Sequence, residues 1–189
     1  MSRSVILPGI GNSGEAHWQT HWEAADPHAR RLRPSDWDRP DLEDWLAALD
    51  CAIAGAGEPP FLVAHSLACL LVAHWAARTA DAAARVRGAF LVAVPDPHGP
   101  AFPTREAPTF RAASPHRLPF ATLVIASSDD PYASLDYARA TAAAWGAGFV
   151  LAGALGHING AIGLGHWPQG LALFDAFRAG AGAAAMPRG

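Results

Sequence analysis

Short apolar runs alternate with longer, helix-like stretches along this chain. Six of the runs have the length and composition of buried β-strands, and the stretches between them place apolar residues at helical spacing. Strands that alternate with helices predict a mostly parallel six-stranded sheet with helices on both faces. We expect strands at residues 4–7, 30–33, 60–64, 88–94, 120–126 and 149–152, and helices at residues 15–24, 40–54, 67–78, 133–145 and 169–178.

The pattern predicts a single α/β domain over residues 3–179, followed by a flexible tail over residues 180–189. The longest irregular stretch, residues 95–119, is rich in proline. It is too short to form a lid domain, so we expect an open, shallow cleft that this loop partly walls.

Composition excludes several classes of function. With 51% hydrophobic and 16% charged residues the chain is not disordered, and its net charge of −3 argues against nucleic-acid binding. No apolar stretch approaches the roughly 18 residues that span a bilayer, and Pro8 interrupts any export leader, so we expect a cytoplasmic protein. All 14 basic residues are arginines, which excludes a Schiff-base or phosphate-loop lysine. No cofactor is expected.

The most informative position is Ser66, between the apolar run 60–64 and the helical stretch 67–78. A serine on a sharp strand-to-helix turn has its hydroxyl exposed, with free helix N–H groups beside it, and this arrangement is a nucleophile elbow. The usual pattern is Gly-x-Ser-x-Gly, whereas here alanines stand at positions 64 and 68. The alternative interpretation is a serine that caps the N-terminus of a core helix.

A serine nucleophile needs a base, and the base needs an acid to orient it. Asp129 and Asp130 follow the apolar run 120–126, and His157 lies in a glycine-rich loop after the run 149–152. The order Ser, Asp, His is that of the α/β-hydrolase fold, in which all three follow strands. His166 is the alternative base. We expect His65, directly before the serine, to have a supporting role.

The loop at residues 8–14 supplies a fourth element of this site. Hydrolases of this fold use one oxyanion-binding N–H from the residue after the nucleophile, here Leu67, and a second from a loop after an early strand. Ile10 is the candidate for the second N–H. The same loop reads Gly-x-Gly-x-x-Gly, but a dinucleotide site also needs an acid about 20 residues later, where this chain has arginines.

Metal catalysis is the enzymatic alternative, because His17 and His21 would share one face of a helix. The metalloprotease pattern requires Glu after the first His, and this chain has Trp18 there. Neither Glu15 nor His28 is fixed as a third ligand. We therefore expect no metal.

Four segments together resemble a known family. They are Leu7 to Gly14 with His17 and Trp18, then Ala64 to Leu67, then Ser127 to Tyr132, and finally Gly156 to Asn159 with Gly163 to Pro168. The chain resembles the small serine hydrolases grouped with retinoblastoma-binding protein 9 and the bacterial YdeN-like proteins. The resemblance implies a compact α/β-hydrolase without a lid. It also implies a triad of Ser66, His157 and Asp130, with Asp129 in reserve. The namesake's Leu-x-Cys-x-Glu partner motif is absent.

These features predict a hydrolase that transfers an acyl group from a small ester, thioester or amide to water. Its partner is a small acyl substrate. Trp18, Phe102, Phe110 and Trp167 are candidate apolar walls of the substrate pocket. The alternative is a catalytically weak hydrolase-fold protein that binds a protein partner.

Overall fold

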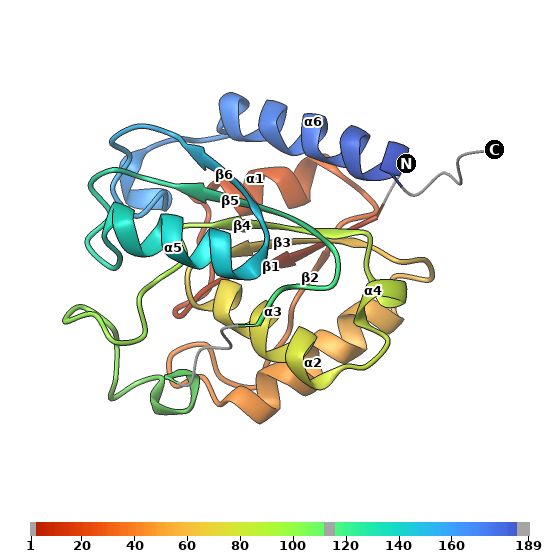
Figure 1. Cartoon of the computed structure of the whole chain (residues 1–189), viewed down its shortest axis with the longest axis horizontal. Coiled ribbons are helices and arrows are strands. Elements are labelled where there is room, and N and C mark those ends of the chain that lie inside the picture. The colour runs from red at the N-terminus through yellow and green to blue at the C-terminus, as the bar shows by residue number, and fades with distance from the viewer. Residues whose placement is uncertain (1–2, 112–115, 185–189) are drawn as a thin grey trace.

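The computed structural model describes residues 3–111 and 116–184. Its core is a six-stranded sheet in the order β2-β1-β3-β4-β5-β6, and all pairs are parallel (Figure 1). The strands are β1 Ser4–Leu7, β2 Arg30–Arg31, β3 Phe61–His65, β4 Gly88–Val92, β5 Ala121–Ala126 and β6 Gly148–Leu151. The helices are α1 Trp18–Ala25, α2 Leu42–Ala54, α3 Leu67–Arg78, α4 Ala82–Arg85, α5 Leu135–Trp145 and α6 Pro168–Ala184, with 3₁₀ turns η1 Pro108–Phe110 and η2 Gly160–Ile162. The predicted α/β-hydrolase fold class is confirmed.

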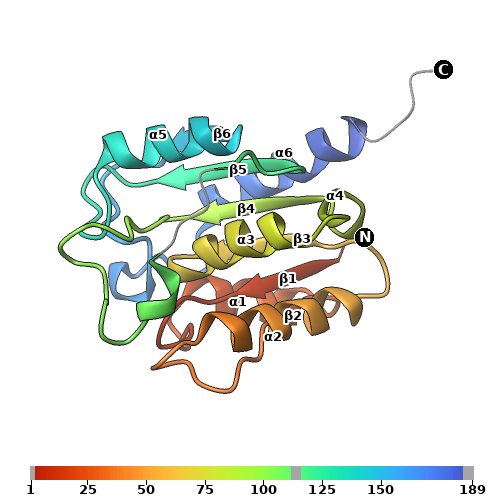
Figure 2. The same ribbon diagram turned by 60° about the horizontal axis from the view of Figure 1, so that its bottom comes forward.

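Helices cover both faces of the sheet, because successive strand residues point to opposite sides. Val5 and Leu62 pack with α2 and α3 in one apolar cluster, whereas Ile6 and Val63 pack with α1 and α6 in another. Figure 2 shows α2 and α3 in front of the sheet and α1 and α6 behind it. Strands buried on both faces explain why these segments read as continuous apolar runs.

Several element boundaries differ from the sequence-based expectation. The first helix begins at Trp18, because His17 adopts extended backbone and caps it. β4 ends at Val92, since Ala93 has a left-handed φ of 56°. The last helix continues to Ala184, because the alanines of this segment favour helix despite its glycines. Of the expected tail, residues 185–189 lie outside the described residues. The short α4 and both 3₁₀ turns were not predicted.

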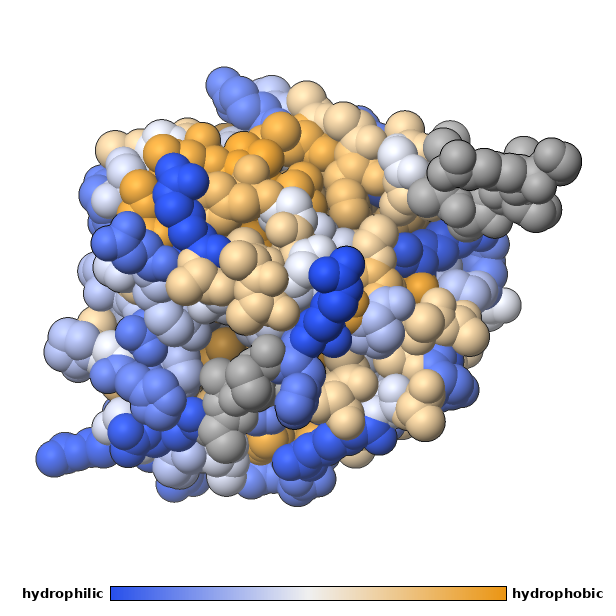
Figure 3. All heavy atoms as spheres, in the orientation of Figure 1, coloured by the Kyte–Doolittle hydropathy of each residue, from blue (hydrophilic) through white to orange (hydrophobic). Residues whose placement is uncertain are grey.

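Within the described residues, the segment between β4 and β5 contains only the turn η1 as regular structure. None of the described helices has the length and apolar character needed to cross a membrane. The outer sheet edge at β6 is only partly covered, and Leu151, Ile162 and Leu171 keep 41%, 42% and 39% of their surface exposed. In Figure 3, hydrophobic surface covers much of the upper part of this face, where Figure 1 shows β6 and α6.

Candidate active site

Ser66 lies at the sharp turn between β3 and α3, with φ 56° and ψ −127°. Positive φ is uncommon for a residue with a side chain, so the surroundings must hold it. The Ser66 N–H donates to the Val92 carbonyl at 2.9 Å, and the Ser66 carbonyl accepts from the Cys69 N–H at 2.9 Å. Ala64 and Ala68 are fully buried beside the turn. The chain therefore forms the elbow with alanine at both usual glycine positions.

One hydrogen-bonded row joins Ser66, His157 and Asp130. Nε2 of His157 lies 2.7 Å from Oγ of Ser66, and Nδ1 lies 2.8 and 3.0 Å from the two Asp130 carboxylate oxygens. The Ser66 and His157 residues are 9% and 8% exposed, and the Asp130 side chain is 4% exposed. A hydroxyl, an imidazole and a carboxylate in this sequence can move a proton from the serine to the ring.

The parallel sheet explains why these three residues meet. Ser66 follows β3, Asp130 follows β5 and His157 follows β6, and the carboxyl ends of parallel strands share one edge. In Figure 2 the arrows of β1, β4 and β5 point toward the left, where the loops that follow the parallel strands gather. The Tyr132 ring packs on the imidazole of His157 with centroids 4.4 Å apart and so restricts its rotation.

Asp129, the reserve acid, has a different set of contacts. Its Oδ1 accepts hydrogen bonds from Ser127 Oγ and from the Gly156 N–H, both at 2.7 Å. These hydrogen bonds, the one from Ser127 first, lower the pKa of the Asp129 carboxyl. Ser127 Oγ also accepts from the Leu155 N–H at 2.8 Å. Asp129 thus holds the loop that carries His157, whereas Asp130 contacts its ring.

His65 contacts the backbone of the same loop. Its Nε2 lies 2.8 Å from the carbonyl oxygen of His157 and must be the donor, since a carbonyl can only accept. Burial lowers the pKa of His65 well below its ordinary value, and the nearby His157 and His17 lower it further. His65 is therefore a neutral ring that supports the position of His157.

His17 and His21, the candidate pair of metal ligands, pack against different partners. The His17 ring packs edge-on against His65 at 4.7 Å between centroids, and His21 packs against His166 at 4.5 Å. His17 lies outside the helix as its N-cap, so the spacing of four does not place it beside His21. Within the described residues, no three potential ligands are grouped for a metal ion. His166, the alternative base, is packed against His21, and it is His157 that contacts Ser66.

The two candidate oxyanion donors line one cleft of about 260 Å³ together with Ser66 and His157. Leu67 is the first residue of α3, and Ile10 lies in the loop after β1. Neither N–H donates a hydrogen bond to another described residue. That loop passes very close to the elbow, because a Cβ added to Gly9 would lie 2.8 Å from Cβ of Ser66.

A buried glutamine, which the sequence reasoning missed, fastens this loop to the sheet. Gln19 is fully buried in α1, and its Nε2 donates to the carbonyls of Leu7 at 3.1 Å and Val63 at 3.0 Å. Its Oε1 accepts from Ser13 Oγ at 2.7 Å. One amide therefore ties the loop to the last residue of β1 and to the middle of β3. A single glutamine in a helix gives no sequence signal of such a role.

Only one of the four predicted pocket walls lines the cleft. Phe102 does so, whereas Trp18, Phe110 and Trp167 are buried in the core. Trp18 donates from Nε1 to the Ile158 carbonyl at 2.8 Å, and Trp167 packs within the same aromatic cluster. Large aromatic side chains bury more area in the core than in an open cleft. Pro95, Ala101 and Pro103 also line the cleft and belong to the loop expected to wall it, whereas the lining that was not predicted comprises Gly9, Asn12, His17, His65, Tyr132 and Asn159.

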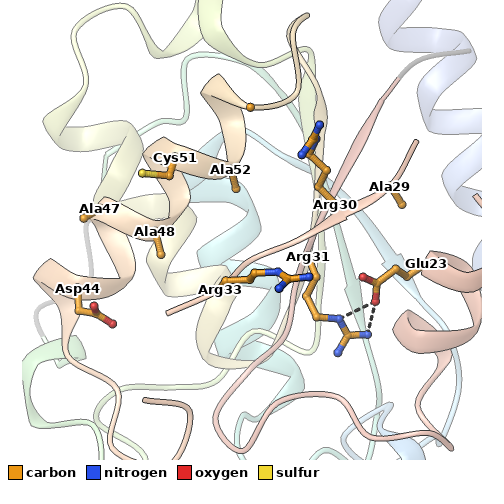
Figure 4. A pocket seen from close by; sticks show the side chains of 11 residues that line it. Glu23, Ala29, Arg30, Arg31, Arg33, Asp44, Ala47, Ala48, Cys51 and Ala52 are labelled. Carbon is orange, nitrogen blue, oxygen red and sulfur yellow. Dashed lines mark hydrogen bonds and ion pairs between the residues drawn. The ribbon is translucent and has the colours of Figure 1, made fainter. Parts of the chain in front are cut away.

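Three larger cavities also lie in the described part of the chain, away from Ser66. One of about 530 Å³ lies between β2 and α2, where Cys51 and three arginines line it (Figure 4). Within the lining of this cavity, Arg31 points toward Glu23 and pairs with it (Figure 4), and it also donates to Asn12 Oδ1 at 2.8 Å. A second cavity, of about 430 Å³, lies between α1 and α6, and a third, of about 500 Å³, is lined by residues 117–121 and Gly146. None of the three contains a residue of the Ser66–His157–Asp130 row.

The parallel sheet, the elbow and the serine–imidazole–carboxylate row define an α/β-hydrolase. Comparison with known proteins specifies the family. A family model described as "Serine hydrolase" matches residues 4–176, and the chain belongs to this family of hydrolases. A search of curated proteins gave no match.

Solved structures place the chain with the YdeN-like hydrolases. A putative YdeN-like hydrolase from Pectobacterium atrosepticum is 30% identical with a TM-score of 0.83, over 96% of this chain and 92% of that one. The ydeN gene product of Bacillus subtilis has 22% identity and a TM-score of 0.70, over 95% and 100% of the two chains. The esterase domain of a Rhodothermus marinus protein shares the fold, with 15% identity, a TM-score of 0.66 and coverages of 94% and 87%.

Proposed function

We propose that this hydrolase cleaves small carboxylic esters through an acyl-enzyme on Ser66. The observation that carries the proposal is the pair of contacts on the His157 ring, 2.7 Å to Ser66 Oγ on one side and 2.8 Å to Asp130 on the other. Thioesters and amides present the same reactive carbonyl and belong to the same proposal.

In the first half of the reaction, His157 Nε2 takes the proton of Ser66 as its oxygen attacks the ester carbonyl. Asp130 keeps the proton of the neutral ring on Nδ1 and stabilises the imidazolium that forms. The N–H groups of Leu67 and Ile10 stabilise the negative oxygen of the tetrahedral intermediate. When the intermediate collapses, the carbon–oxygen bond breaks and His157 returns its proton to the alcohol.

In the second half, water enters and loses a proton to His157 as it attacks the acyl-enzyme carbonyl. Collapse of the second intermediate releases the carboxylic acid, and the serine recovers its proton. The cleft volume of about 260 Å³ favours short acyl groups. Its lining contains no Asp, Glu, Lys or Arg, which favours uncharged ones.

An active-site-directed fluorophosphonate tests the nucleophile. We expect it to label the wild-type protein and to leave Ser66→Ala unlabelled, because only an activated serine displaces the fluoride. The exposed Ser134, which caps α5, offers a matched control, and Ser134→Ala should be labelled like wild type. Equal labelling of Ser66→Ala and wild type would remove Ser66 from this role.

Turnover of short-chain nitrophenyl esters tests the base. His157→Ala should lower kcat by several orders of magnitude, since the hydroxyl loses its proton acceptor. Equal rates for His157→Ala and wild type would instead favour the alternative, a hydrolase-fold protein whose cleft serves only to bind a partner.

A further inference from the structure

The cleft beside Ser66 has two walls of different chemistry. β1 and β4 flank β3 in the sheet, so the loops that follow them lie on opposite sides of Ser66. The loop after β4 contributes an apolar wall made of Pro95, Ala101, Phe102 and Pro103. On the other side are Asn12 and His17, after β1, and Asn159. A Cβ added to the neighbouring Gly160 would lie 3.4 Å from the His17 nitrogen, which places Asn159 next to His17. We call Asn12, His17 and Asn159 the polar wall.

Hydrogen bonds fix the orientation of both amides in the polar wall. Asn12 Oδ1 accepts from the Ser13 N–H and from Arg31, both at 2.8 Å. Asn159 Oδ1 accepts from the Ala161 N–H at 3.1 Å and so caps η2. Each carbonyl oxygen is thereby committed to the protein, and each Nδ2 remains as an N–H₂ donor. Neither Nδ2 donates to another residue in the described part of the chain.

The tautomer of His17 follows from its contacts in the same way. Nδ1 accepts from the Gln19 N–H at 3.2 Å, so that nitrogen carries no proton. Burial lowers the pKa of His17 to about 4, with smaller contributions from Arg31 and His157, and the ring is neutral at physiological pH. The single proton is therefore on Nε2. Nε2 is buried and has no hydrogen-bond partner among the described residues.

The polar wall thus consists of uncharged side chains: the N–H₂ groups of Asn12 and Asn159 are free to donate, and beside them the Nε2–H of His17 is buried. We propose that it recognises a second, uncharged oxygen of the substrate, such as an ether, hydroxyl or carbonyl oxygen, while an apolar arm packs against Phe102. The substrates are then short esters that carry an additional oxygen acceptor in the acyl or alcohol arm. This inference rests on the proposed ester hydrolysis at Ser66 and narrows it to one class of ester.

Two pairs of isosteric substrates test the proposal. In the acyl pair, an ether oxygen replaces the γ-methylene of para-nitrophenyl pentanoate, which gives the methoxypropanoate ester. In the alcohol pair, the same replacement converts butyl acetate into methoxyethyl acetate. Each kcat/KM is divided by the rate constant for alkaline hydrolysis of the same ester. This normalisation removes the difference in intrinsic reactivity between the two members of a pair. We expect the oxygen-containing member of at least one pair to be favoured by about threefold to tenfold, the worth of one hydrogen bond.

Two variants then test whether Asn12 or Asn159 binds the additional oxygen of the substrate. Asn12→Asp and Asn159→Asp keep the Oδ1 acceptor that each turn needs but replace the N–H₂ donor with an oxygen. In at least one of them the preference for the oxygen-containing ester should disappear or reverse. Gln169→Glu is the matched control, because it makes the same amide-to-acid change at an exposed position outside the cleft, and its preference should equal that of wild type.

The outcomes are distinguishable. If wild type hydrolyses both members of both pairs equally, or if both Asn variants keep the preference, the polar wall does not recognise oxygen and the inference is wrong while the proposed function stands. If wild type hydrolyses none of the esters, the proposed function itself fails and the inference fails with it. The comparison of wild-type rates needs no variant, so it can contradict the proposal even if a variant folds poorly.

Discussion

Nε2 of His65 donates a hydrogen bond of 2.8 Å to the backbone carbonyl of His157, and His65 is the residue that directly precedes Ser66. This contact joins the strand that presents the nucleophile to the loop that presents the base. The loop contains unusual backbone, since Ile158 has φ 47° and Gly156 has φ 51°. A side chain next to the elbow therefore helps to set the position of the imidazole.

Replacement of His65 tests this positioning role. His65→Phe keeps the ring but leaves the His157 carbonyl without its buried donor, and we expect kcat to fall by roughly tenfold to a hundredfold with KM little changed. His65→Gln restores an N–H donor and should recover most of the rate. Equal kcat values for His65→Phe and wild type in steady-state ester hydrolysis would show that the contact is only structural.

The lowered pKa of His17 predicts that stability depends on pH. The pKa is about 4 in the folded protein against 6.5 as the ordinary value, so the unfolded chain takes up a proton first as the pH falls. The contribution of His17 to the free energy of unfolding is full above pH 6.5. It declines by about 3 kcal/mol as the pH falls to about 4. The buried His65 acts in the same direction.

Chemical denaturation at a series of pH values measures this effect. His17→Asn keeps a good N-capping side chain but removes the titrating ring, so the free energy of unfolding should vary less with pH in this variant than in wild type. Identical pH profiles for the two proteins would contradict the prediction.

The close approach of Gly9 to the elbow predicts a steric effect. A methyl group at this position would meet Ser66 Cβ at 2.8 Å and the His65 carbonyl at 3.2 Å, so either the loop or the serine must move. We expect Gly9→Ala to lower kcat/KM by about a hundredfold, the typical result of displacing reacting groups by about 1 Å.

Gly14, in the same loop, is the matched control. A Cβ there has no atom within 4 Å, and its φ is not in the left-handed region. Gly14→Ala should therefore hydrolyse nitrophenyl esters at nearly the wild-type rate. Similar losses in both variants would mean that general loosening of the loop, and not contact with Ser66, causes the effect.

The different contacts of the two neighbouring aspartates predict unequal effects of the same substitution. Asp130→Asn should lower kcat by about 10⁴, because an amide facing Nδ1 favours the wrong tautomer of His157. Asp129→Asn keeps an oxygen that can accept from the Gly156 N–H, so its loss should stay below about tenfold. Steady-state kinetics of the pair decide the assignment, and a larger loss for Asp129→Asn would reverse it.

Sequence patterns anticipated the fold and the convergence of Ser66 and His157 with one of two neighbouring aspartates, Asp129 or Asp130. Buried parallel strands leave continuous apolar runs, and residues that follow such runs gather at one sheet edge. The choice between Asp129 and Asp130 was left to the family resemblance, because both follow the same strand. The hydrogen bonds of Asp129 to Ser127 and Gly156 distinguish them only in three dimensions.

The walls of the cleft were largely out of reach of sequence reasoning. Trp18 and Trp167 were plausible pocket residues by their place near the motifs, but the fold buries both in the core. Asn12 and Asn159 are common loop residues, and their free amide nitrogens follow from turn geometry. Gln19 donates hydrogen bonds to carbonyls of two strands that are distant from each other in sequence, and a local sequence pattern cannot predict such contacts.

The two cysteines differ sharply in their surroundings. Cys51 is exposed at the cavity between β2 and α2, whereas Cys69 is buried in α3 and its thiol has a pKa raised mainly by burial. Thiolates are the reactive form, so a maleimide dye or a linker will attach at Cys51 and spare Cys69. The native chain therefore already provides a unique handle for fluorescence or surface immobilisation, at a point remote from the cleft that holds Ser66.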